Sequence, residues 1–537
     1  MSLLPPPWPV PAPAPARPAD SFDALLALIA SRRAALPVLS WKDPLHAHPA
    51  WAHLSGRALV QQVDAAAALL GGQLGVAAGD RVAWLGLNDP AQIVLLFALA
   101  RLGAVFVPLN HRLSPAEWVA VMDDCTPALL VCDAGLQAAA HELATRCARV
   151  PTLLAAQALT DSPPHHASPP PNAQGPDALD QPLLLVYTSG TTGQPKGVCL
   201  DIATQLAVAQ SLVQASASCA VERHLCVLPL ATLLENIAGV YAPLLAGARI
   251  ELMPMAQIGL LGASQFDLPR FLGALAQAQP NSLILLPQLL LALVSAGENR
   301  LPLPSSLRFI AVGGGRVASQ LLQRADALGL PVFEGYGLSE CASVVCLNTP
   351  ENRRIGTVGQ PLPHLQVRLA TDGEVMVQGP RLLGYLGEPC PDEEWLGTGD
   401  LGHFDGPFLV LHGRKKHQFI TAFGRNVNPE WVEAELVQQL PIAQAWLHGE
   451  ALPGNVAVLV PRVPNTPDSQ LAEAVATANQ ALPDYARVHH WLRAEQPFSS
   501  ANALATSNGR LRRTALLNHY QHAIEQLMAT ESCYGDA

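Results

Sequence analysis

One short segment of the chain concentrates residue types that suit phosphate chemistry. The segment YTSGTTGQPKGVC begins at Tyr187 and follows the apolar run LLLV, so hydroxyls and glycines come directly after an expected buried strand. Backbone N–H groups in a glycine-rich turn can converge on an anion, and hydroxyls and Lys196 add donors and charge. A Walker P-loop requires Gly-Lys-Ser/Thr, whereas the lysine here lies in QPKG. The alternative is a flexible turn, and we interpret the segment as a nucleotide phosphate loop of another class.

The string TSGTTGQPKG resembles the phosphate loop of the adenylate-forming superfamily, which includes acyl-CoA synthetases, firefly luciferase and the adenylation domains of peptide synthetases. Further motifs follow in the order of that family, from GDRVAWLGLN at Gly79 to NGRLRR at Asn508. The resemblance therefore covers nearly the whole chain. It implies that Lys196 is catalytic, that Thr191 lies near a metal, and that the loop binds ATP through Thr188, Ser189, Gly190, Thr191, Thr192 and Gly193.

Later motifs resemble the rest of the nucleotide site in that family. In GYGLSE the tyrosine would stack on adenine, the hydroxyl residue would contact phosphate, and Glu340 would hold Mg²⁺, which prefers hard carboxylate ligands. In TGD the aspartate would accept from both ribose hydroxyls. VGGGRVA is similar to the glycine segment that lies along the adenine and the acyl pocket, and Arg414 of GRKKH would contact ribose. The expected ATP and AMP contacts are Gly313, Gly314, Gly315, Glu334, Gly335, Tyr336, Gly337, Ser339, Asp400 and Arg414.

The resemblance implies a two-step reaction. A carboxylate attacks the α-phosphate of ATP to give acyl-adenylate and pyrophosphate, and a thiol then displaces AMP. Positioning and charge neutralisation would supply most of the catalysis, and the C-terminal domain is expected to rotate between the steps. The implied cofactors are ATP, Mg²⁺ and coenzyme A, and the segment GRKKHQFITAFGRNVNPEWVE resembles the hinge and the coenzyme A channel, represented by Phe423, Gly424 and Arg425.

Two positions depart from the family pattern. The family usually ends in PLTxNGKxxR, whose lysine bridges the substrate carboxylate and the α-phosphate, but here ALATSNGRLRR places Arg510 at that position. Arginine keeps the charge but presents a planar fork, so either Arg510 performs the lysine's role with altered geometry or adenylation is impaired. The hinge position is His417, which we interpret as a tolerated surface residue, with a pH-sensitive hinge as the alternative.

The acid substrate is predicted to be hydrophobic. LPLATLLENIAGVYAPLLAGARI resembles the pocket helix of long-chain acyl-CoA synthetases, although Thr232 stands where those relatives have histidine. The helix has no counterpart of the aspartate that peptide synthetases use to hold an α-amino group, so we expect an apolar acid, a fatty acid by this resemblance, and not an amino acid. Apolar residues at this spacing are also typical of a core. The expected pocket residues are Thr232, Leu233, Asn236, Ile237, Val240, Gly313, Leu338 and Val344.

The order of the predicted elements indicates how these residues are positioned. From about residue 57, strand-like runs such as RVAWLGLN alternate with helix-like runs such as AQIVLLFALARLG, which is typical of sheets covered by helices. One helix should start at Ser114, with Pro115 in its first turn and Glu117 completing a capping box. We expect an α/β fold like that of acyl-CoA synthetases and luciferase, with a large N-terminal domain of parallel or mixed sheets at 1–414, a hinge at 415–417, and a small α+β lid at 418–537.

Composition excludes several classes of function. The net charge of −11 and the scattered basic residues argue against a nucleic-acid partner. The proline-rich start lacks the pattern of a signal peptide or a membrane span, so we expect a cytoplasmic protein without a transmembrane segment. The ten cysteines form no CxxC pair or metal-ligand pattern and should be reduced. The pair His165–His166 lies in a Pro-rich connection and is interpreted as a solvated loop.

Three functions remain open from the sequence. The leading hypothesis is an AMP-forming acyl-CoA synthetase whose partners are a small carboxylic acid, ATP and coenzyme A. The chain contains no recognisable carrier domain, so the second hypothesis is an acyl-adenylate ligase that loads a separate acyl carrier protein. The third, motivated by Arg510 and His417, is a non-catalytic adenylate-binding protein.

Overall fold

The computed structural model describes residues 21–42, 50–160, 181–189, 195–261, 265–389, 393–506 and 509–532. The expected connection with His165–His166 and the loop residues Gly190, Thr191, Thr192 and Gly193 lie outside these ranges. Within the described ranges, no helix combines the length and apolarity needed to cross a bilayer. The cysteines in this part of the chain are free thiols.

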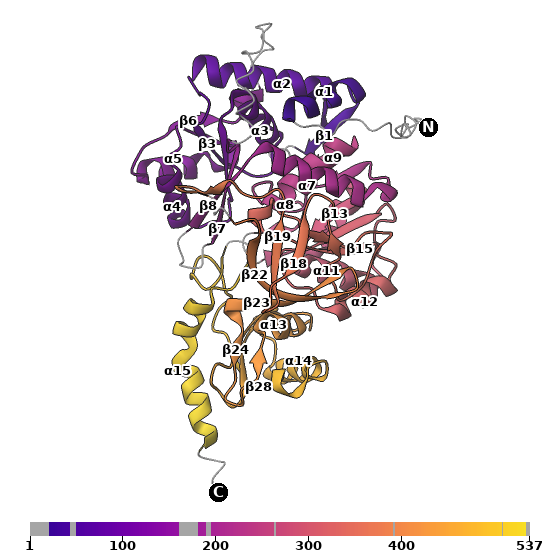
Figure 1. Cartoon of the computed structure of the whole chain (residues 1–537), viewed down its shortest axis with the longest axis vertical. Coiled ribbons are helices and arrows are strands. Elements are labelled where there is room, and N and C mark those ends of the chain that lie inside the picture. Colours follow the sequence, from indigo (N-terminus) through magenta and orange to yellow (C-terminus); the bar gives the residue numbers. More distant parts are fainter. Residues whose placement is uncertain are drawn as a thin grey trace.

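Two large mixed sheets form the main body of the N-terminal part (Figure 1). Both have a parallel centre, as expected for strands connected by helices; the first has antiparallel strands at one edge and the second has them at both. The first has the order β21-β20-β8-β7-β4-β3-β5-β6. Its strands are β3 (Arg81–Leu85), β4 (Val105–Leu109), β5 (Leu129–Cys132), β6 (Thr152–Ala155), β7 (Leu184–Ser189), β8 (Pro195–Leu200), β20 (Gly384–Tyr385) and β21 (Glu388–Pro389).

The second sheet has nine strands in the order β17-β16-β15-β14-β13-β9-β10-β1-β2. They are β1 (Pro37–Lys42), β2 (Trp51–Ser55), β9 (Arg223–Leu225), β10 (Arg249–Leu252), β13 (Ser282–Leu285), β14 (Phe309–Val312), β15 (Val332–Tyr336), β16 (Cys346–Leu347) and β17 (Gln360–Pro361). Strands β14 and β15 are parallel neighbours, so both deliver the residues after their carboxyl ends to one edge of the sheet.

Helices pack between the two sheets and on their other faces. The layer between them forms one core with side chains of both sheets and contains α1 (Phe22–Arg32), α2 (Gly56–Ala68), α3 (Pro90–Leu102) and α7 (Ile202–Ala215). Helix α3 is apolar on every side and buried along its length, and it begins at the cap Asp89 and ends before Gly103, whose φ of 68° suits glycine. The other helices of this part are α4 (Pro115–Cys125), α5 (Gln137–Arg146), α6 (Gln157–Thr160), α8 (Leu233–Asn236), α9 (Ala242–Ala246), α10 (Leu268–Ala278), α11 (Pro287–Glu298) and α12 (Ser319–Ala327).

The predicted capping box of α4 is confirmed. Ser114 Oγ accepts from the backbone N–H of Glu117, and the Glu117 carboxylate accepts from the backbone N–H of Ser114. Because each side chain satisfies a free N–H of the other residue, the Glu117 carboxylate is held in one orientation at the start of the helix.

A four-stranded antiparallel sheet leads into the C-terminal part of the chain. Its strands are β18 (Gln366–Leu369), β19 (Glu374–Gln378), β22 (Leu396–Asp405) and β23 (Phe408–Arg414). After a single turn at Lys415–His417 come β24 (Phe419–Ile420), β25 (Asn426–Val427), α13 (Pro429–Val437), β26 (Ile442–His448), β27 (Asn455–Pro461), α14 (Asp468–Gln480), β28 (Val488–Arg493) and α15 (Arg513–Ser532). Figure 1 shows this part below the two large sheets.

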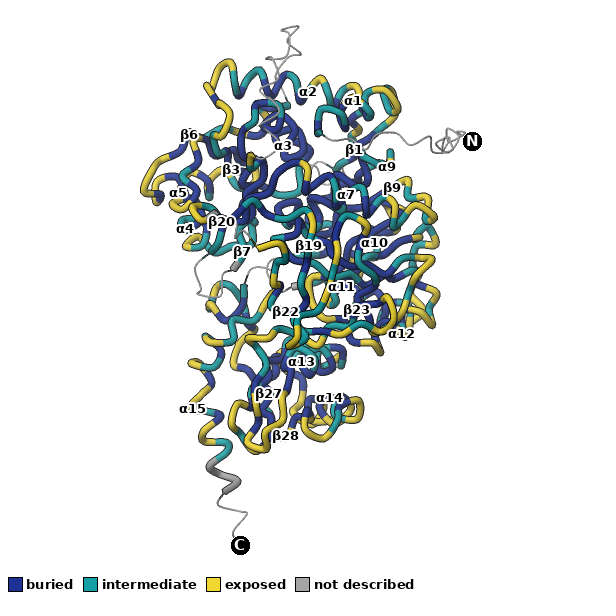
Figure 2. Tube along the Cα trace, in the orientation of Figure 1, coloured by how far each residue is buried: buried dark blue, intermediate teal, exposed yellow. Residues whose placement is uncertain are grey.

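The C-terminal part has its own small core. Its three-stranded sheet β26-β27-β28 packs against α13 and α14 on one face and against α15 on the other. Figure 2 shows mostly buried residues along the central strands, and many exposed residues along α14 and α15. The predicted α/β class, with a large N-terminal and a small C-terminal α+β part, is confirmed.

Candidate active site

A cavity of about 2620 Å³ extends between the large sheets and the C-terminal part. It opens where β14 and β15 end and where β7 meets β8, which is the usual ligand position in open α/β sheets. Predicted site residues from distant parts of the sequence meet there. Those that line it are Thr188, Lys196, Thr232, Leu233, Gly313, Gly314, Gly315, Glu334, Gly335, Tyr336, Gly337, Leu338, Ser339, Glu340, Val344, Asp400, Arg414, His417 and Arg510.

Asp400 lies at the centre of a small polar network on this cavity. Asp400 and Arg414 are paired across β22 and β23, and Arg414 Nε lies 2.9 Å from Asp400 Oδ1. The Tyr336 hydroxyl donates to Asp400 Oδ2 over 2.7 Å. Burial raises the pKa of the Asp400 carboxyl, while Arg414 and the Tyr336 hydroxyl act against that rise. The network places a carboxylate, an aromatic ring and a guanidinium together, which suits a ribose and an adenine.

The glycines of this region allow backbone segments to approach closely. A Cβ on Gly337 would lie 1.5 Å from the backbone oxygen of Ser343, so only glycine fits there. Glu334, three residues before Gly337 in strand β15, is buried beside the guanidinium of Arg316. Burial raises the pKa of Glu334 to about 8 although Arg316 acts to lower it. A neutral carboxyl group there can donate a hydrogen bond to a bound ligand.

Glu340 and Lys196 face each other across Tyr385. The Tyr385 hydroxyl donates to Glu340 Oε1 over 3.0 Å, and Lys196 Nζ lies 4.9 Å from the centre of the Tyr385 ring. Lys196 also lies 3.7 Å from Glu388. Tyr385 and Glu388 were not predicted from the sequence, because they come from two very short strands, β20 and β21, that join the sheet through the pairing of β20 with β8. Glu340 retains oxygen lone pairs for a hard cation, so the group fits Mg²⁺.

Arg510 reaches the same cavity from the C-terminal part. Its side chain lines the cavity and is exposed to solvent. Desolvation by the surrounding protein, together with the neighbouring positive charge of Arg414, lowers the pKa of the Arg510 guanidinium, while Asp400 and Glu340 oppose the shift. The guanidinium remains protonated and lies among the carboxylates predicted to hold ribose and metal. The structure therefore brings the unusual arginine to the predicted site.

The wall of the acid pocket differs in detail from the prediction. Thr232, Leu233, Leu338 and Val344 line the cavity, but Asn236, Ile237 and Val240 are buried away from it. The helix turns a different face to the cavity than predicted, and that face carries Leu234, Ala238 and Ala242, which are spaced four apart. A π-helical turn at Ile237–Tyr241 carries Ile237 and Val240 into the core between the sheets.

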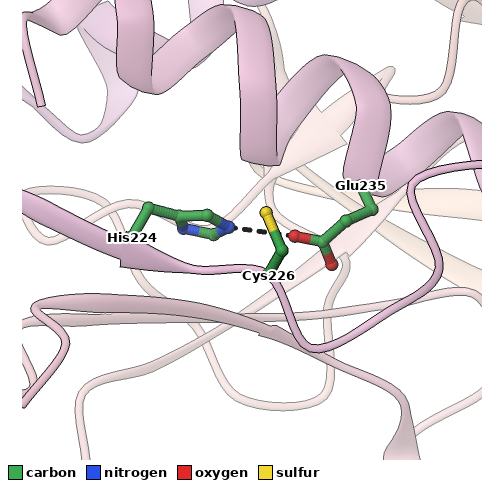
Figure 3. A group of neighbouring side chains, drawn as sticks. All are labelled: His224, Cys226 and Glu235. Atoms are coloured by element: carbon green, nitrogen blue, oxygen red, sulfur yellow. Dashed lines mark hydrogen bonds and ion pairs between the residues drawn. The ribbon is translucent and has the colours of Figure 1, made fainter. Parts of the chain in front are cut away.

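A buried polar cluster of His224, Cys226 and Glu235 lies beside this wall, and His224 also lines the cavity (Figure 3). His224 Nε2 lies 3.0 Å from Glu235 Oε1, and its Nδ1 lies 2.8 Å from Ser282 Oγ. Glu235 Oε2 accepts from the backbone N–H of Leu228 over 3.0 Å. Burial and the Glu235 charge raise the pKa of the Cys226 thiol well above its ordinary value, and the thiol donates to the backbone oxygen of Gly239 over 3.7 Å. We interpret the cluster as a hydrogen-bonded support of the wall.

The predicted coenzyme A residues lie elsewhere in this conformation. Phe423, Gly424 and Arg425 form an exposed turn between β24 and β25, and Phe423 is 76% exposed. None of the three lines the cavity. Within the C-terminal part, Arg510 therefore lines the cavity, whereas this turn does not.

The turn between the two parts is held by ion pairs. His417 Nδ1 lies 2.5 Å from Glu430 Oε1. Burial acts to raise the pKa of Glu430, but the hydrogen bond from His417 and the charge of Arg513 outweigh it and lower that pKa. Arg513 also binds both oxygens of the buried Glu433, at 2.9 and 2.6 Å. His417 therefore has a structural partner in addition to its position on the cavity.

Comparison with known proteins identifies the family. Residues 30–386 match the family described as AMP-binding enzyme, and residues 416–532 match the AMP-binding enzyme C-terminal domain. The chain is a member of the AMP-binding enzymes. Among similar AMP-binding enzymes, an indoleacetate–CoA ligase of Aromatoleum aromaticum is 30% identical over 411 residues, covering 70% of this chain and 76% of the relative. A 2-succinylbenzoate–CoA ligase of Bacillus cereus is 29% identical over 402 residues, with the same shares covered.

Solved structures share the fold. An anthranilate–CoA ligase in complex with anthranoyl-AMP matches with a TM-score of 0.78 at 19% identity, covering 92% of this chain and 96% of that one. The o-succinylbenzoate–CoA synthetase of Bacillus subtilis in complex with its acyl-adenylate matches with a TM-score of 0.74 at 23% identity, covering 92% and 97%. The architecture predicted from the motifs is therefore that of this family.

Proposed function

We propose that the protein is an ATP-dependent acid–CoA ligase: it converts an apolar carboxylic acid to the acyl-adenylate and transfers the acyl group to coenzyme A, releasing pyrophosphate and AMP. The observation that carries this proposal is the meeting of Asp400, Glu340, Lys196 and Arg510 on one cavity whose other wall is apolar.

The nucleotide half of the reaction follows from the charged groups. Asp400 would accept hydrogen bonds from the ribose hydroxyls, and Tyr336 would lie against the adenine. Lys196 and Arg510 would neutralise phosphate oxygens while the acid attacks the α-phosphate, because preorganised charge stabilises the transition state. Glu340 would hold Mg²⁺, which supplies charge neutralisation at the phosphates. Thr191, outside the described residues, remains a predicted metal contact.

The apolar wall indicates the class of acid. Along the lining between Leu212 and Ser295, the described residues include no lysine or arginine, and Asp267 is the one carboxylate. A second carboxylate on the substrate would find no counter-charge along that stretch, which favours an apolar monocarboxylic acid. The relatives named above act on indoleacetate, succinylbenzoate and anthranilate. We therefore propose aromatic as well as aliphatic acids, a wider class than the fatty acid suggested by the pocket helix.

Thiol transfer requires a second arrangement of the chain. We propose that residues 418–537 form a lid that turns about 415–417, so that the turn at Phe423, Gly424 and Arg425 replaces Arg510 at the cavity. This division of the chain stays a prediction, as does a cytoplasmic location. Coenzyme A is the proposed acceptor, and a separate carrier protein is the alternative.

A pyrophosphate-release screen of the full-length protein tests the function. The acids are butyrate, decanoate, palmitate, phenylacetate, indoleacetate, benzoate, anthranilate and succinylbenzoate, each with ATP and Mg²⁺, with and without coenzyme A. We expect pyrophosphate and a coenzyme A thioester with at least one apolar monocarboxylate, and weak activity with succinylbenzoate. A thioester formed only on an added carrier protein would favour the carrier ligase, and nucleotide binding without pyrophosphate from any acid would favour the non-catalytic protein.

A further inference from the structure

An ion pair joins the C-terminal part to the start of helix α4 at the edge of the cavity. Arg512 Nη2 lies 2.5 Å from Glu117 Oε1, and the side chains are 30% and 22% exposed. The residues are 395 positions apart in the sequence, so the contact depends on how the C-terminal part docks. Both residues also line the cavity that Arg510 enters.

The Glu117 side of this pair is fixed before Arg512 arrives. Glu117 Oε2 accepts from both the backbone N–H and the hydroxyl of Ser114, each over 2.9 Å. These bonds leave Oε1 for Arg512 and hold the carboxylate in one rotamer. Because the carboxylate is already ordered, the pair loses less side-chain entropy than an ordinary surface ion pair.

The Arg512 side is fixed to Arg510. Leu511 forms an antiparallel β-bridge with Ala505. On either side of it, the backbone N–H of Arg512 donates to the backbone oxygen of Leu504 over 2.9 Å, and the backbone N–H of Thr506 donates to the backbone oxygen of Arg510 over 2.7 Å. The segment is therefore extended, and residues two apart in an extended segment point to the same side. Leu511 packs into the C-terminal core, while Arg510 and Arg512 share the opposite side.

The segment is also anchored at its far end. Arg513 binds Glu433 through two hydrogen bonds, and Glu433 accepts from the backbone of Leu447 over 2.8 Å in strand β26. The anchor makes Arg510 and Arg512 move with the C-terminal part as one unit. Fixing Arg512 on Glu117 therefore fixes where the Arg510 guanidinium lies in the cavity.

We propose that Glu117 and Arg512 form a positioning pair, which sets Arg510 for the pyrophosphate-releasing step without touching the substrate. The proposal rests on the proposed function. Loss of the pair would misplace the Arg510 charge, which acts on the transition state, so kcat should fall. The affinity for ATP in the ground state should change little.

The test compares full-length variants in the two half-reactions. Glu117→Gln keeps the capping box, since glutamine serves there as well, but removes the charge. Arg512→Gln removes the partner, and Arg512→Lys keeps its charge. Glu142→Gln is the matched control, because Glu142 forms an exposed ion pair with Arg146 away from the cavity.

With the best acid of the screen, Glu117→Gln and Arg512→Gln should each lower kcat for pyrophosphate release by about three- to fivefold, with little change in KM for ATP. Arg512→Lys should retain most of the rate, and Glu142→Gln all of it. Conversion of supplied acyl-adenylate and coenzyme A to thioester should be unchanged. Combined with Arg510→Ala, the Arg512→Gln change should cause no further loss, because the pair acts through Arg510.

Several results would overturn the proposal. If the wild type is active and Glu117→Gln and Arg512→Gln release pyrophosphate at the same rate, the pair has no role. If the loss in rate caused by Arg512→Gln multiplies with the loss caused by Arg510→Ala in the double variant, the pair acts independently of Arg510. Equal losses in both half-reactions would indicate general damage to the fold. A wild type that releases no pyrophosphate with any acid would instead overturn the proposed function, and the pair's role with it.

Discussion

Replacing Arg510 by alanine should slow the first half-reaction and spare the second. In the structure the Arg510 guanidinium enters the cavity beside Asp400 and Glu340, where the phosphates of ATP are proposed to lie. It is therefore placed to neutralise charge that develops on the α-phosphate. The thiol transfer has no such requirement once the adenylate has formed.

The size of the effect follows from the position of the group. A charge-assisted hydrogen bond contributes about 1.5–3 kcal/mol. Arg510 remains in contact with solvent through the cavity, so water replaces part of its effect, and the lower half of that range applies. A loss of about 1.5–2 kcal/mol corresponds to a roughly 12- to 30-fold slower release of pyrophosphate.

The assay measures pyrophosphate at saturating ATP and acid, and, separately, thioester formed from supplied acyl-adenylate and coenzyme A. Arg510→Lys should restore most of the first rate, since lysine keeps the charge. Arg146→Ala, on the exposed helix α5, is the control for loss of an arginine. Equal losses in both half-reactions, or full pyrophosphate release by Arg510→Ala, would refute the assignment and direct the search to Lys416.

Three further predictions concern the nucleotide site. Asp400→Ala should weaken ATP binding by tenfold or more in calorimetry, because one carboxylate would serve both ribose hydroxyls; unchanged affinity in a folded variant removes that role. Glu340→Gln should raise the Mg²⁺ concentration needed for half-maximal pyrophosphate release, and normal magnesium dependence would assign the metal to another residue. Burial raises the pKa of Glu334 from 4.5 to about 8, so its contribution to stability is fully present below pH 4.5 and is lost as pH rises through 8. Glu334→Gln should therefore gain stability over wild type in urea unfolding from about pH 5 to pH 8, and a constant difference would contradict the buried acid.

The sequence by itself determined the local features of this protein. The Ser114–Glu117 capping box was predicted correctly because its hydrogen bonds join residues three apart, so no tertiary contact is needed to form it. The glycines after β14 and the motif ending in Glu340 could be placed at strand ends because the strands are short apolar runs bounded by turn residues. The motifs also identified the family, and the order of elements gave its fold class.

Only the tertiary structure decided which side chains meet. The face of the pocket helix was predicted wrongly in part: Ile237 and Val240 lie in a π-helical turn and pack into the core, and the sequence carries no signal for that turn. Tyr385 reaches Glu340 only because the short strand β20 pairs with β8. The contact of Arg512 with Glu117 joins residues 395 apart and arises from the docking of the C-terminal part. Such contacts depend on packing between distant segments, which the spacing of residues along the chain does not encode.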